Sequence, residues 1–261
     1  MNFSKELKDS INKSTLDYIN QKEIASSKYV KHKSAIVFDT YSDGTHNPNF
    51  NEKSLRNISK NEDWKIRLTK KHTHFKDGTL EMASSNSSDA LLMNIFCHPK
   101  FSTWKGPNTI LGFANELPKF GINPGIESHS SPTEIDMILG DVLYEAKLTE
   151  TDFTTKDLQT VQRVYPDIDD IFDLEYLSDG DSVKHYQLLR NIYAVHKMDG
   201  ISKFILLVDS RRPDLLHCLF DVLKAIRDDE LRRSCGFITW QQIARTVGED
   251  LKEFLQLKYG I

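Results

Sequence analysis

Asp136, Glu145 and Lys147 are the residues of this sequence whose types and spacing best fit divalent-cation chemistry. They lie in the run PTEIDMILGDVLYEAKL (132–148), in which successive side chains divide into two alternating sets, as they do along β-strands. Gly140–Asp141 separates the two strands and suits a two-residue turn with positive φ. The run is therefore predicted to form a β-hairpin that carries all three charged side chains.

A two-residue turn fixes which side chains of the hairpin face each other. It places Asp136 opposite Glu145, with Cβ atoms roughly 5 Å apart. Two opposed carboxylates destabilise a sheet unless a cation lies between them, and Mg²⁺ prefers such oxygen ligands together with waters and phosphate oxygens. Lys147, on the same face, could hold or deprotonate a water beside the metal. The alternative is a solvated hairpin in which Glu134 and Lys147 form an ordinary ion pair.

The order of these residues resembles the PD-(D/E)XK nuclease superfamily, the restriction-endonuclease-like proteins. The resemblance rests on Asp136 followed by Glu145-Ala146-Lys147, and it extends over about residues 84–245. The run EAKLTETDF (145–153), with YQLLRN (186–191) downstream, is similar to a bacterial branch of that superfamily. Ile135, rather than the proline of the superfamily's name, precedes Asp136. The resemblance implies Mg²⁺ as cofactor, for which Mn²⁺ can substitute, bound by the two carboxylates and the Ala146 carbonyl.

The resemblance also implies roles for residues outside the hairpin. A glutamate on the first core helix often joins the metal site, and Glu116 is the candidate by its order in the chain, with Glu127 as its rival. The helix after the second hairpin strand packs beside the site, so Gln187 is expected at the site edge, Arg190 in contact with phosphate and Asn191 in contact with substrate. The alternative for each of them is an ordinary solvated polar residue.

The whole chain has the composition of a globular protein. Its 261 residues are 39% hydrophobic and 28% charged, with a net charge of −4, and they contain no apolar run long enough to span a membrane. The N-terminal residues lack the apolar core of a signal peptide, and three scattered cysteines fit a reducing compartment, so a cytoplasmic location is expected. Residues 1–76 carry 15 Lys and Arg against 9 Asp and Glu, which could supply phosphate contacts.

The predicted order of elements indicates an α/β protein, namely a restriction-endonuclease-like αβββαβ core with a mixed central sheet flanked by helices. Residues 1–80 are expected to form a helical, basic extension that packs on the core, and residues 81–261 the nuclease-like domain. Helices are predicted over 3–30, 83–96, 107–117, 183–198, 213–233, 240–247 and 251–257. Strands outside the hairpin are predicted over 35–39, 120–128, 203–209 and 236–239.

Two classes of function fit these patterns. The first is a metal-dependent endonuclease that hydrolyses phosphodiester bonds, most simply those of double-stranded DNA, with Asp136, Glu145, Lys147, Glu116 and Gln187 as the catalytic set. The second is a non-catalytic nucleic-acid-binding or scaffolding protein that retains the nuclease fold. A hydrolase of another phosphodiester substrate is a variant of the first. A homodimer is compatible with either, because enzymes that cut two strands are often symmetric.

Overall fold

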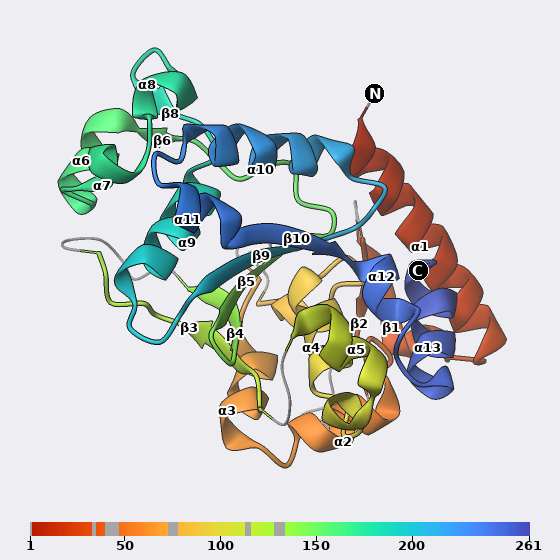
Figure 1. Ribbon diagram of the computed structural model, residues 1–261. Helices are drawn as coiled ribbons and strands as arrows, with labels where there is room; N and C mark the ends of the chain where they lie inside the picture. The colour runs from red at the N-terminus through yellow and green to blue at the C-terminus, as the bar shows by residue number, and fades with distance from the viewer. Residues whose placement is uncertain (1, 33–34, 40–46, 73–77, 113–115, 128–133) are drawn as a thin grey trace.

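A five-stranded mixed sheet forms the centre of the molecule (Figure 1). The computed structural model describes residues 2–32, 35–39, 47–72, 78–112, 116–127 and 134–261. The strand order is β10-β9-β5-β4-β3, where β3, β4 and β5 are antiparallel neighbours and β5, β9 and β10 run parallel. The strands are β3 (Lys119–Ile122), β4 (Ile135–Leu139), β5 (Val142–Ala146), β9 (Lys203–Val208) and β10 (Cys235–Thr239).

The predicted hairpin is present with the predicted register. Leu139 pairs with Val142 and Met137 with Tyr144, and Gly140 adopts a φ of 61° in the turn. Residues 132 and 133 of the predicted run lie outside the described residues. Every residue of β5 is buried, as expected for a central strand covered on both faces.

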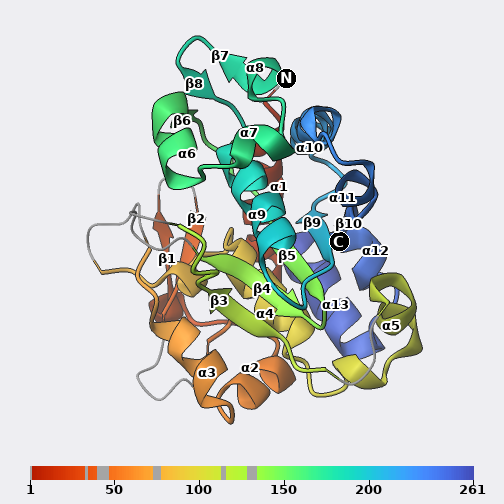
Figure 2. The same cartoon turned by 60° about the vertical axis from the view of Figure 1, so that its left-hand side comes forward.

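Helices cover both faces of the sheet, each over its own apolar cluster. One cluster joins Leu143 and Phe204 to α9 (Tyr186–Lys197) and α10 (Pro213–Ala225). The other cluster joins the opposite face to helices from the N-terminal half and from the C-terminal end of the chain, as Figure 2 shows for α4 (Ser88–Phe96) and α13 (Glu249–Tyr259). The helices of this second layer are α1 (Phe3–Gln21), α4 (Ser88–Phe96), α5 (Lys105–Leu111), α12 (Trp240–Ala244) and α13 (Glu249–Tyr259). The predicted fold class is confirmed.

The helices predicted over 3–30 and 213–233 are interrupted in the structure by turns or tertiary contacts. The N-terminal helix ends at Gln21, and the chain then forms β1 (Tyr29–His32), which pairs with β2 (Ala35–Phe38). The helix predicted over 213–233 breaks at Ile226, whose backbone is extended and forms a β-bridge with Phe172. The chain resumes as α11 (Asp229–Arg233).

The remaining elements are short. The N-terminal part contains α2 (Glu52–Ile58), α3 (Glu62–Lys65) and the 3₁₀ helices η1 (Ser26–Lys28), η2 (Ile66–Thr69), η3 (Glu81–Ala83) and η4 (Phe101–Thr103). After the hairpin come β6 (Lys156–Asp157), α6 (Leu158–Val164), α7 (Ile168–Ile171), α8 (Leu174–Leu177), β7 (Ser178–Asp179) and β8 (Ser182–Val183). These post-hairpin elements form a small lobe at the upper left of Figure 1.

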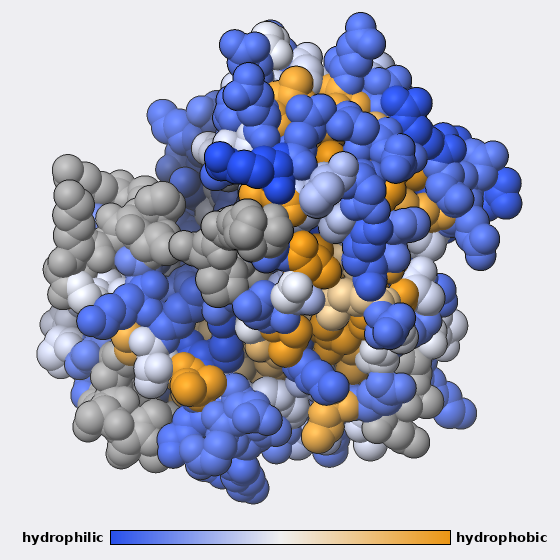
Figure 3. Space-filling view, turned by 90° about the vertical axis from the view of Figure 1, so that its left-hand side faces the viewer, coloured by the Kyte–Doolittle hydropathy of each residue, from blue (hydrophilic) through white to orange (hydrophobic). Residues whose placement is uncertain are grey.

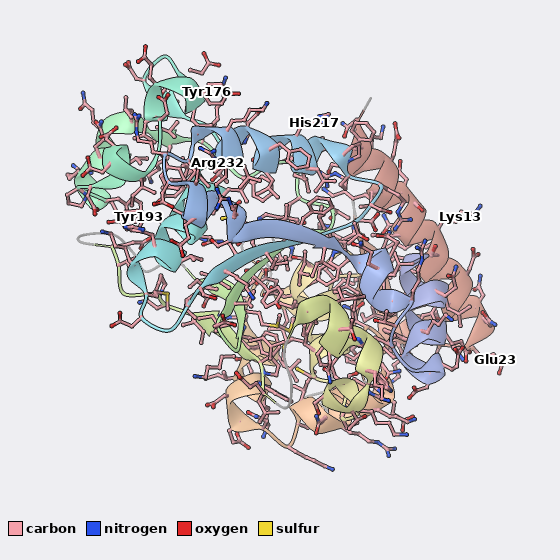
Figure 4. All side chains as sticks on the ribbon, viewed as in Figure 1. Lys13, Glu23, Tyr176, Tyr193, His217 and Arg232 are labelled. Atoms are coloured by element: carbon pink, nitrogen blue, oxygen red, sulfur yellow. The ribbon has the colours of Figure 1, made fainter. Side chains whose placement is uncertain are left out.

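The small lobe is attached to α9 through polar contacts as well as apolar packing. Tyr193, labelled on α9 in Figure 4, donates a hydrogen bond of 2.5 Å to Asp167, and Asp167 also pairs with Lys197. At the other side of the molecule, α1 runs along α13, so the two ends of the chain share one apolar cluster.

The division of the chain at residue 80 into an extension and a nuclease-like domain stays a prediction. None of the described helices combines the length and apolar character needed to cross a membrane.

Candidate active site

The two hairpin carboxylates lie where the β4–β5 ladder ends, and each is held by a hydrogen bond. Asp136 Oδ2 accepts from the Ala146 N–H at 2.7 Å, in place of the next ladder bond. Glu145 is 2% exposed, and its Oε2 accepts from Asn191 Nδ2 at 2.5 Å. The backbone N–H of Ala146 and the side-chain amide of Asn191 therefore fix the two carboxylates before any ligand binds.

Lys147 lies within contact distance of Glu145. Its Nζ is 2.8 Å from Glu145 Oε1 and donates to Gln187 Oε1 at 3.1 Å. The same ammonium lies 5.4 Å from the centroid of the Phe153 ring. The Lys147 carbonyl accepts from the Trp240 indole N–H at 2.9 Å, which anchors the strand end to α12. The ordinary cross-strand pair of Lys147 with Glu134 does not form.

Electrostatics set the charge states of Asp136 and Lys147. Burial raises the pKa of Asp136 well above its ordinary value, and the negative charges of Glu145 and Asp89 raise it further. Burial lowers the pKa of Lys147, but the carboxylates of Glu145, Glu150 and Asp136 more than compensate and raise it above its ordinary value. The site therefore carries a charged ammonium among carboxylates that repel one another.

Side chains of helix α9 contact the charged residues of the hairpin. Gln187, expected at the site edge, lies in the first turn of α9 and accepts a hydrogen bond from Lys147. Asn191 has no exposed surface and bonds Glu145, so it holds a carboxylate and is not reachable by substrate. Arg190 is 6% exposed and lines the cleft, while its guanidinium donates inward to Asn191 Oδ1 and to the Glu134 carbonyl.

Two strained residues place α9 against the hairpin. Thr154 and His185 both have a φ of 58°, which is unfavourable for side chains with a Cβ. The Tyr186 N–H donates to the Thr154 carbonyl and the Gln187 N–H donates to the Phe153 carbonyl. The two strained turns thus lock together the loop that carries Phe153 and the helix start that carries Gln187.

The donor set of the hairpin fits a hard divalent cation. The Lys147 N–H donates to the Leu207 carbonyl of β9, and the carbonyl of a trans peptide points opposite to the N–H that follows it. The Ala146 carbonyl therefore points away from β9, toward the strand of Asp136. Two carboxylates and one carbonyl are oxygen ligands of the kind that Mg²⁺ prefers. Within the described ranges, no group of three or more His, Cys, Asp or Glu side chains could hold a metal by itself.

The structure does not bring either predicted outer glutamate to the hairpin carboxylates. Helix α5 ends at Leu111, because Gly112 takes a left-handed conformation with a φ of 72°. Glu116 is exposed, and its carboxylate lies beside Gly140 at the far end of the hairpin, roughly 13 Å along the strand from Asp136. Glu127 accepts a hydrogen bond of 2.8 Å from the Tyr165 hydroxyl instead. Residues 113–115 of the predicted helix lie outside the described residues.

Asp89 is the outer acid that the sequence interpretation missed. It lies in the first turn of α4, after the N-cap Ser87, and is 6% exposed. Its carboxylate pairs with Arg67 at 3.0 Å and with Lys70 at 3.5 Å. The sequence did contain one indication of this role, because Asp89 is an acid at the start of an otherwise apolar helix. A charge buried at such a position requires a partner.

The three hairpin residues Asp136, Glu145 and Lys147 line one cleft, with a volume of about 890 Å³, together with Asp89, Gln187 and Arg190. Its acidic lining residues outnumber its lysines and arginines. The acids are Glu81, Asp89, Glu134, Asp136, Glu145, Glu150 and Asp152, and the cations are Lys8, Lys70, Lys147 and Arg190. Elsewhere on the surface hydrophilic side chains predominate, as on the face in Figure 3, where apolar residues show as patches between them. An acidic cleft repels phosphate unless further cations are bound.

The fold and the hairpin site together define a restriction-endonuclease-like α/β protein. Residues 13–260 match the family described as Restriction Endonuclease associating with ARP, and the chain belongs to that family. The match covers the central sheet, both helical layers and the hairpin. None of the curated proteins matches the chain, and none of the solved structures does.

Proposed function

We propose that this chain is a PD-(D/E)XK-type endonuclease that hydrolyses phosphodiester bonds of DNA with Mg²⁺ or Mn²⁺. The observation that carries the proposal is the meeting of Asp136, Glu145 and Lys147 in one cleft of a restriction-endonuclease family member. The acidic lining supports it too, because bound cations would be needed before a phosphate could enter. A partner described as ARP is proposed from the family's name alone.

The hairpin residues would divide the chemistry among them. Asp136, Glu145 and the Ala146 carbonyl would hold the metal ion. When bound, that ion would polarise the phosphate and stabilise the charge of the transition state. Lys147, charged in this environment, would orient a water by hydrogen bonding and stabilise the anionic phosphate oxygens. Removing the proton from that water is a task that its raised pKa disfavours.

Residues of α9 would position these groups without touching the reacting atoms. Asn191 fixes the rotamer of Glu145, and Gln187 fixes the position of the Lys147 ammonium. Arg190 remains the candidate for a phosphate contact from this helix, because it lines the cleft. Glu116 has no part in the proposed site.

Nicking of supercoiled plasmid by the purified full chain tests the proposal. Glu145→Gln keeps the size of the side chain and removes the charge, so cleavage in Mn²⁺ should fall about 10²–10³-fold. The matched control is Asp141→Asn, an exposed acid in the turn of the same hairpin, which should cleave like wild type. EDTA should abolish cleavage by every variant.

A second measurement separates the enzyme from the non-catalytic alternative. Calorimetry with Mn²⁺ should show binding that Asp136→Asn removes. Equal cleavage by wild type and Glu145→Gln would refute the assignment of the site. If wild type neither cleaves nor binds Mn²⁺, the nucleic-acid-binding or scaffolding function is correct instead.

A further inference from the structure

A second group of charges occupies the part of the cleft next to Asp136. Lys70 Nζ lies 3.1 Å from Glu81 Oε2, 3.1 Å from Glu134 Oε2 and 3.5 Å from Asp89 Oδ2. One ammonium thus faces three carboxylates that come from η3, from the residue before β4 and from α4. The cluster adjoins the hairpin carboxylates, because Asp89 is close enough to raise the pKa of Asp136.

Arg67 completes this charge cluster and is firmly held. Its guanidinium is 3.0 Å from Asp89 Oδ2 and 3.0 Å from Glu134 Oε2, so Arg67 and Lys70 share the same two oxygens. Arg67 is 8% exposed. It packs on Gly121 of β3 so closely that a methyl group there would lie 2.1 Å from Nη1. Gly121 has a φ of 61°, so glycine suits both the backbone and the close approach.

This arrangement commits Asp89 Oδ2 and Glu134 Oε2 to Arg67 and Lys70. A divalent ion that bound Asp89 would add two positive charges beside the Lys70 ammonium and the buried Arg67 guanidinium, which already share that carboxylate. Displacing either cation from Asp89 is unfavourable, because breaking one side of a buried ion pair leaves charge uncompensated. In the described part of the chain, the acids accordingly form no three-carboxylate metal group.

We infer that Lys70 and Arg67 take the place of a second divalent cation, so that the cleft binds one metal ion, at Asp136 and Glu145. This inference rests on the proposed function and makes it more specific. Lys70 places a positive charge permanently among the carboxylates beside the metal site, and its side chain lines the cleft and is 32% exposed. Lys70 is thus a positioning residue whose charge limits how many metal ions the cleft accepts.

Counting bound Mn²⁺ tests the inference without reference to activity. Equilibrium dialysis of the full chain, with metal analysis, should give one Mn²⁺ per wild-type chain. Asp89→Asn should also bind one, because that carboxylate is not a ligand. Lys70→Met should bind two, since three carboxylates would lose their ammonium, whereas Lys70→Arg should again bind one. Lys71→Met, which removes the adjacent exposed lysine, is the matched control and should bind one.

The outcomes separate this inference from the proposed function. Two Mn²⁺ per wild-type chain, reduced to one by Asp89→Asn, would overturn the inference and leave the proposed function standing. No Mn²⁺ on wild type, or Mn²⁺ binding that Asp136→Asn does not reduce, would overturn both. Should Lys70→Met not fold, the counts for wild type and Asp89→Asn still decide the matter.

Discussion

Two lysines of this protein are almost equally buried but lie in opposite electrostatic environments, one among carboxylates and one without a carboxylate partner in the described part of the chain. Lys147 is 5% exposed and lies among Glu145, Glu150 and Asp136, which raise its pKa despite burial. Lys258 is 0% exposed, and burial lowers its pKa well below the ordinary value. Its Nζ lies 3.5 Å from the Ser85 carbonyl and 3.7 Å from the centroid of the Tyr259 ring. Among the described residues, no carboxylate pairs with Lys258.

The difference shows that burial alone does not mark a functional lysine. Desolvation disfavours the charged form of both side chains, and only the presence of opposite charges decides which one stays charged. Lys147 keeps its charge on the wall of a cleft, where, in the proposed function, a phosphate would meet it. Lys258 lies under α1 and β2, where a neutral amine costs less than an ammonium. Substitutions at four positions and one pH series test this contrast.

The largest effect is expected from Lys147→Met. Cleavage should fall about 10²–10⁴-fold, because the group that orients the water is lost. The free energy of unfolding should also fall by roughly 3 kcal/mol, since Glu145 would stay buried without a cation. Plasmid nicking and urea unfolding measure the two effects. Wild-type cleavage by a folded Lys147→Met variant would remove Lys147 from the site.

The same substitution at the other lysine should act in the opposite direction. Lys258→Met keeps an unbranched side chain of similar size and removes a buried amine, so the free energy of unfolding at pH 7 should rise by about 1–3 kcal/mol. Cleavage should match wild type. Urea unfolding at pH 7 provides the measurement, and a loss of stability would show that Lys258 has a charged partner.

The pH dependence of stability should report the state of Lys258 directly. Its pKa is depressed in the folded protein, so the unfolded chain binds more protons below the ordinary lysine pKa of about 10.4. Stability should therefore rise with pH between neutrality and about pH 10, by up to about 1.4 kcal/mol per pH unit from this one group. In Lys258→Met that part of the slope should be absent. Parallel slopes for both proteins would contradict the depressed pKa.

Asp136→Asn tests whether the carboxylates around Lys147 repel one another. The pKa of Asp136 is raised, so in EDTA at pH 7 its ionised form opposes folding, and this cost is absent below the ordinary aspartate pKa. The asparagine oxygen can still accept from the Ala146 N–H. In EDTA the variant should be more stable than wild type by about 1 kcal/mol at pH 7 and equal to it at pH 4. Lower stability at pH 7 would mean that Lys147 outweighs the repulsion.

Local patterns were enough to predict the hairpin, its register and helix α9, which the small lobe separates from the hairpin in the chain. The two-residue turn at Gly140 determines that Asp136 faces Glu145, and the apolar run 203–208 indicates a strand buried on both faces. These features depend on residues close together in the chain, so their spacing contains the information. Gln187 was expected at the site edge from the family resemblance, not from spacing, and its side chain contacts Lys147.

The missed features depend on contacts between distant segments. Asp89 reaches the cleft because α4 packs under β5, and Arg67 and Lys70 arrive from a region that sequence patterns left unassigned. Glu116 was chosen by order along the chain, but α5 ends at Gly112 before it. Asn191 was expected to meet substrate, whereas its amide bonds Glu145. For Asp89, Arg67, Lys70 and Asn191, a partner from a distant segment decides the position of the side chain.

The smallest expected effect concerns the strained loop that places Phe153 against Lys147. Thr154 is exposed and held at a φ of 58°, so Thr154→Gly should relieve backbone strain and raise the free energy of unfolding by about 0.5–1 kcal/mol after the entropy of glycine is counted. Thr154→Ala keeps a Cβ and should leave stability unchanged, which separates strain from loss of the side chain. Equal gains from both variants would show that the backbone at this position is not strained. Because the Thr154 carbonyl accepts from the first turn of α9, a gain confined to glycine would show that strain is stored where the loop positions the partners of Lys147.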